Sequence, residues 1–253
     1  DQMLGGLPGI MNLVAASGED LGQVSDIVTD ALTAFNMTAD QAGRFADVLA
    51  QASSNSNTNV AMMGATFQKV APVAGALGYS VEDVSLAIGL MANASIKSEV
   101  AGTSLKTALA NMAKPTKQMK EYMDKYGISL TNADGSMKSF REVVDNLRSS
   151  LGGLSETEQV AAATAIFGKE SFAGMLAIVN ASEADFKKLS DSVNNSAGAA
   201  ERMAQIKLDN FQGKVTLLQS AVEGLQIALG DALLPTFTEG AEKAAELISK
   251  LTE

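Results

Sequence analysis

The sequence contains no cysteine, no histidine and no tryptophan, and only four prolines among its 253 residues. Without cysteine there is no disulfide framework and no thiol nucleophile. Because cysteine and histidine are the usual zinc ligands and histidine is the usual base near neutral pH, their absence excludes the common zinc sites and imidazole catalysis. Carboxylate sites for calcium or magnesium stay open.

Positive charge is also scarce, and its distribution is uneven. The formal net charge is −10. Residues 1–68 carry seven acidic residues and one basic residue, residues 69–138 carry six and eight, and residues 139–253 carry sixteen and ten. Because phosphate contacts need clustered lysine and arginine, we expect no specific nucleic-acid binding.

Long hydrophobic runs are missing as well. The longest, at 70–81 and 84–96, are uncharged for about a dozen residues each, whereas a membrane-spanning helix needs about 20. The chain starts at Asp1 without a methionine and ends inside an apparently helical pattern, so we expect a fragment of a longer protein.

What the sequence does contain is helical periodicity with good helix starts. Ser80 and Asp83 form a near capping box, and Val84 and Ile88 follow at the spacing of one buried helix face. Pro72, inside the preceding apolar pattern, is expected to kink or split that helix. We expect a mostly α fold of roughly eleven to thirteen helices.

A repeat of 42 residues is visible in the first half of the chain. When the sequence is shifted by this length, residues 35–53 resemble the later stretch, with Thr38 on Ser80. The pattern predicts two tandem helical hairpins, at about 35–76 and 77–118. Chance similarity between two alanine-rich helical stretches is the alternative.

Residues 128–138 are the one expected β element. Ile128 and Leu130 alternate with polar residues, and Asp134-Gly135 is a turn signal, which predicts a small hairpin. An EF-hand calcium loop would need an acid where Arg141 stands, so the turn is favoured.

We therefore expect three parts: a repeat-containing helical core at 1–118, a second helical group around the hairpin at 119–197, and a long helix with a tail at 198–253. The last part carries apolar residues at alternating spacings of three and four, which is typical of a coiled coil or of a helix along a bundle. Self-association and packing on the chain's own core are both open. The seam consists of Leu208, Phe211, Val215, Leu218, Val222, Leu225 and Leu229.

Several blocks of the sequence resemble the core region of phage tail tape measure proteins, a family of long-tailed phages and prophages. The most specific block reads SSNSNTNVAMMGATFQKVAPVAGALGYSVEDVSLAIGLMANASIKSEVAGTSLKTALANMAKPT, at 53–116. The similarity also covers 20–53 and 126–182, and it continues to Gly230–Pro235. It thus extends over nearly the whole chain.

The resemblance implies a structural virion protein of the tail tube lumen, made in the host cytoplasm. Such a protein sets tail length, templates tail tube assembly and is released at DNA ejection. The implied partners are the tail tube protein, tail assembly chaperones and tail-tip or baseplate proteins, together with further copies of the chain.

Two other classes of function are weighed against this one. A membrane-active helical module that assists DNA delivery is the alternative, and residues 70–96 are the stretch on which it depends. An enzyme is not expected, because the acid pairs Glu19–Asp20, Glu82–Asp83 and Glu156/Glu158 stand where helix starts favour acids. We expect no catalytic residue, no cofactor and no metal.

Overall fold

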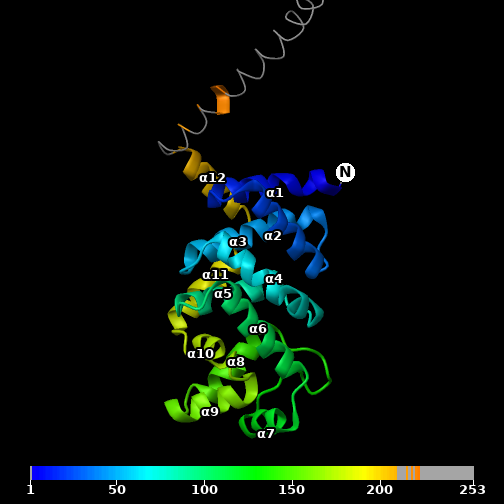
Figure 1. Cartoon of the computed structure of the whole chain (residues 1–253), viewed down its shortest axis with the longest axis vertical. Coiled ribbons are helices and arrows are strands. Elements are labelled where there is room, and N and C mark those ends of the chain that lie inside the picture. Colours follow the sequence, from blue (N-terminus) through cyan, green and yellow to red (C-terminus); the bar gives the residue numbers. More distant parts are fainter. Residues whose placement is uncertain (1, 210–214, 216–217, 219, 223–253) are drawn as a thin grey trace, which may run out of the picture. The chain divides into compact units, whose positions relative to one another are not determined.

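The computed structural model describes residues 2–209, 215, 218 and 220–222. Over these residues the chain forms twelve α-helices and one 3₁₀ helix and contains no strand, which confirms the mostly α expectation (Figure 1). The elements are α1 Gln2–Ser17, α2 Leu21–Ala34, η1 Ala39–Gln41, α3 Ala42–Asn55, α4 Val60–Ala76, α5 Val81–Asn93, α6 Ser98–Ala113, α7 Lys117–Tyr126, α8 Phe140–Leu151, α9 Glu156–Phe167, α10 Phe172–Val179, α11 Glu183–Asn194 and α12 Ala199–Asp209.

Serine and acidic side chains begin several of these helices as expected. At α5, the Asp83 backbone N–H donates to Ser80 Oγ at 3.1 Å, and the Ser80 backbone N–H donates to Asp83 Oδ2 at 3.0 Å. The same reciprocal pairs start α8 and α9. Each pair satisfies two backbone groups at the helix start, which explains why these helices begin at these residues.

The helices of residues 1–204, which form one compact unit, pack in overlapping pairs (Figure 1). In the first half α1 packs on α3, α2 on α4, α3 on α5 and α4 on α6. The chain then returns, so that α11 lies against both α3 and α5, while α9 and α10 lie against α6. Residues 205–253 form the second unit.

Aromatic side chains connect these layers inside the core. The Phe45 and Phe67 rings meet edge to face at 5.3 Å, between α3 and α4. Tyr79 and Phe140 meet in the same way at 5.5 Å, which joins the α4–α5 connection to α8. Edge-to-face pairs are favourable because the ring edge is positive and the face negative.

Of the kink or split expected at Pro72, the split does not occur. The helix α4 runs without a break from Val60 to Ala76 with Pro72 inside it. Proline removes the donor that would reach the carbonyl of Gln68. Because Gln68 is exposed, water can satisfy that carbonyl, and the helix continues.

The predicted hairpin is not confirmed, although its turn is present. Gly135 has a φ of +85°, and the Asn132 backbone N–H donates to Ser136 O at 2.8 Å. In the described part of the chain, the pairing amounts to one isolated antiparallel bridge between Thr131 and Met137. The 42-residue repeat and the three predicted parts stay predictions.

Candidate functional site

The predicted seam lies at the end of the described residues. Leu208 and Val215 are half-buried, whereas Leu218 is 65% exposed and Val222 is 46% exposed. Phe211, Leu225 and Leu229 lie outside the described residues. Two large apolar side chains of the seam therefore face solvent in the isolated chain, and the seam stays a prediction.

The start of α12 is held by an acidic side chain that sequence reasoning missed. The Gly198 backbone N–H donates to Asp47 Oδ2 at 2.7 Å, and the Ala200 backbone N–H donates to Asp47 Oδ1 at 2.9 Å. Gly198 has a φ of +71°, in the left-handed region that favours glycine. The carboxylate on α3 thus caps a distant helix, since Gly198, just before α12, lies 151 residues after Asp47.

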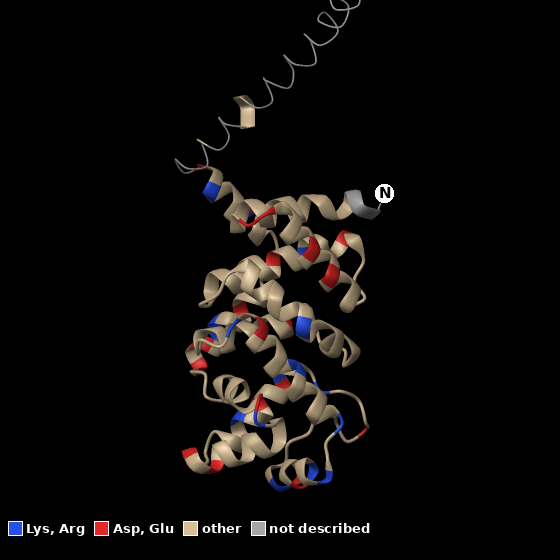
Figure 2. Ribbon diagram, in the orientation of Figure 1, with Lys and Arg blue, Asp and Glu red and all other residues tan. Residues whose placement is uncertain are grey.

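Basic residues are unevenly distributed over the first unit (Figure 2). The segment 1–68 carries Arg44 as its single basic residue. Arg44 donates two hydrogen bonds to Glu82, from Nε and Nη2, at 2.7 Å each. Basic residues gather instead on and beside α7 (Figure 2). The charged residues of helix α2, Asp26 and Asp30, are therefore both acidic.

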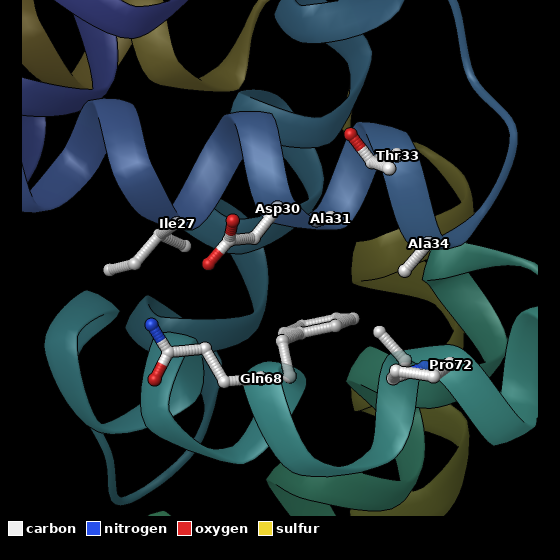
Figure 3. Close-up of a pocket in the computed structure, with 9 residues that line it drawn as sticks. Ile27, Asp30, Ala31, Thr33, Ala34, Gln68 and Pro72 are labelled. Carbon is white, nitrogen blue, oxygen red and sulfur yellow. The ribbon is translucent and has the colours of Figure 1, made fainter.

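A hollow of about 430 Å³ lies between α2 and α4 (Figure 3). Its sides are mostly apolar, and Asp30, Thr33 and Gln68 supply polar groups at its edge. Ile27 and Asp30 on α2 point towards α4, and Gln68 on α4 points back towards α2 (Figure 3). The complete lining is Ile27, Asp30, Ala31, Thr33, Ala34, Phe67, Gln68, Ala71 and Pro72.

One carboxylate of each acid pair caps a helix start in the structure. Asp20 accepts from the Gln23 backbone N–H at 3.1 Å, and Asp83 closes the capping box of α5. At α9, hydrogen bonds from the Ser155 side chain and backbone lower the pKa of Glu158. These carboxylates are thereby assigned a structural role at helix starts.

Among the described residues, Tyr79 has a strongly shifted pKa. Burial, assisted by the charge of Asp83, raises the pKa of its hydroxyl to about 12. The hydroxyl is buried and has no hydrogen-bond partner within the described part of the protein. It is therefore neutral at physiological pH, in the core beside Phe140.

The apolar stretch 70–96 is largely packed inside the first unit. On α5, Leu86, Ile88 and Leu90 are each at most 3% exposed. Within the described residues no helix has the length and apolar character to cross a membrane, and no cluster of acidic side chains is suited to a metal ion.

Comparisons with known proteins identify the family to which the chain belongs. Residues 1–168 match the phage-related minor tail protein family, and the chain belongs to that family. Across 94% of its length the chain is 35% identical to the tape measure protein of Pneumococcus phage Dp-1. Across 99% it is 22% identical to a probable tape measure protein of Escherichia phage P2. The resemblance to phage tail tape measure proteins is thus confirmed.

The chain covers 21% of the Dp-1 protein and 31% of the P2 protein, so it spans about a fifth to a third of these relatives. No solved structure matches it significantly. Family membership makes the chain part of a phage-related minor tail protein.

Proposed function

We propose that this chain is part of a tape measure that sets the length of a phage tail and templates the assembly of the tail tube. The observation that carries the proposal is the similarity to the Dp-1 tape measure protein across 94% of this chain. The helical fold supports it, because an α-helix adds length in proportion to its residue number, about 1.5 Å per residue.

The proposed location is the lumen of the tail tube, from which the protein leaves when DNA is ejected. The proposed partners are the tail tube protein, the tail assembly chaperones and the tail-tip or baseplate proteins. The role is mechanical rather than catalytic. The capping roles of Asp20, Asp83 and Glu158 support this view, because they account for the acid pairs without a reaction.

The test changes the length of the protein in a phage that carries it. Whole heptads are added to the full-length protein within residues 208–229, and tail length is measured by electron microscopy. Each added heptad should lengthen the tail by about 10 Å, since seven helical residues span that distance.

A length-neutral variant, Ser220→Ala, is the control and should give tails of the original length, because Ser220 is exposed. Tails of unchanged length in phages that carry several added heptads would contradict the proposal.

A further inference from the structure

The hollow between α2 and α4 is a consequence of how the two helices approach each other. A Cβ atom at Gly64 would lie 2.3 Å from Ile27 Cδ1, and one at Gly75 would lie 2.2 Å from the carbonyl oxygen of Ala34. The two glycines therefore allow close contact at both ends of the crossing. Between these contacts the lining includes short alanine side chains, which leave the space open.

The floor of the hollow consists of apolar side chains that are packed against the core. Ile27, Phe67 and Ala71 are each at most 4% exposed, and the Phe67 ring is held edge to face by Phe35 and Phe45. Atoms that line an unfilled space lack dispersion contacts on one side. An aliphatic side chain inserted from outside would supply these contacts and remove apolar surface from water.

The acidic edge indicates the charge of the partner. Asp30 lies at the edge, and Asp26 stands one turn earlier on the same face of α2, where two like charges destabilise a helix. Among the residues that the structure describes, neither aspartate forms an ion pair.

Two basic residues on the neighbouring helices α3 and α4 are directed elsewhere. Arg44 is engaged with Glu82. Lys69 lies on the side of α4 that faces α6, where a Cβ at Gly102 would be 2.7 Å from Lys69 Cβ. Because no ion pair of the described residues neutralises Asp26 or Asp30, this edge attracts a basic partner.

We propose that this hollow is a docking site for a helix of a partner protein that inserts one large aliphatic side chain between two basic residues spaced four apart. The aliphatic side chain enters the hollow, and the two bases pair with Asp26 and Asp30. Four helical residues rise about 6 Å, so bases at this spacing match the spacing of the two aspartates. The site is distinct from the predicted seam and does not depend on the tail-length function.

The test uses the full chain and a synthetic alanine-rich helical peptide that carries leucine between two lysines spaced four apart. A second peptide with glutamate in place of lysine is the matched control. Binding is measured by the fluorescence anisotropy of the labelled peptide. We expect the lysine peptide to bind and the glutamate peptide not to bind.

Two variants of the chain separate the hollow from general charge attraction. Asp30→Lys should weaken binding by about tenfold or more, because it turns attraction into repulsion. Asp40→Lys changes the net charge equally but lies in η1, outside the lining, and should leave the affinity unchanged.

Gln68→Trp tests the cavity itself. Gln68 is exposed, so the substitution is compatible with folding, and the indole would cover the hollow and weaken binding. Equal weakening by Asp30→Lys and Asp40→Lys would overturn the proposal, as would unchanged binding to Gln68→Trp or no binding of the lysine peptide to the unmodified chain.

Discussion

Asp47 is a partly buried aspartate on α3 whose hydrogen-bond partners lie far away in the sequence. Both carboxylate oxygens accept from backbone N–H groups at the start of α12. A second polar contact of this helix is the Ser54 hydroxyl, which lies 3.3 Å from Met203 Sδ. Hydrogen bonds to a charged group are the stronger kind, so Asp47 is a principal anchor of α12.

We expect Asp47→Ala to lower the free energy of unfolding by about 2 kcal/mol, because two backbone donors lose a charged acceptor. Chemical denaturation measures this change. Hydrogen exchange should also become faster at the amides of Gly198 and Ala200.

The matched control is Asp40→Ala in η1, which removes an exposed acid and should cost less than about 0.5 kcal/mol. If the two variants lose equal stability, the contacts of Asp47 with α12 contribute nothing specific.

At the scale of elements, the capping boxes of α8 and α9 couple helix stability to pH. Hydrogen bonds from the side chain and backbone of Ser139 lower the pKa of Glu142, and those of Ser155 do the same for Glu158. A carboxyl whose pKa is lower in the folded state stabilises the fold above its unfolded pKa. That stability is lost as pH falls through the folded pKa.

Replacing both Glu142 and Glu158 by glutamine should therefore reduce the loss of folding stability at acidic pH. Glutamine retains an oxygen that accepts from the serine, but it does not titrate. The measurement is the thermal midpoint between about pH 5 and pH 2, where the wild-type chain should lose more stability than the double variant.

Glu121→Gln on α7 is the control and should follow the wild-type profile, because Glu121 caps no helix in the structure. A double variant with the wild-type slope would show that these capping bonds do not control the acid sensitivity.

At the scale of the whole molecule, the predicted seam is the feature that would join copies of the chain. Leu218 and Val222 are exposed in the isolated chain, and both belong to the predicted seam. Apolar side chains repeated at heptad spacing favour association, because a second helix removes them from water.

We expect the chain to associate in solution and Leu218→Lys to be a monomer, because a lysine in the middle of the seam would have to bury its charge. Molar mass from light scattering tests this. Ser220→Lys introduces the same charge at an exposed position off the seam and should associate like the unmodified chain. If all three chains are folded monomers, the seam does not join copies.

Local signals in the sequence were sufficient for most helix starts. The start of α5 is predicted because a serine and an acid three residues apart act within a single turn, and the same pattern begins α8 and α9 in the structure. The turn at Gly135 was predicted for the same reason, since its geometry depends on adjacent residues. The strands around it were not confirmed, because a ladder needs a partner and alternation alone does not supply one.

The sequence by itself determined the mostly α class, the acidic first segment and, through its resemblance, the family. Only the tertiary structure decided that Asp47 caps α12, that α11 returns to α3 and α5, and that Gly64 and Gly75 bring α4 against α2 around a hollow. The physical reason is the distance along the chain over which each interaction acts. Periodicity and caps act over a few residues, whereas these contacts join segments far apart in the chain and depend on how whole helices pack.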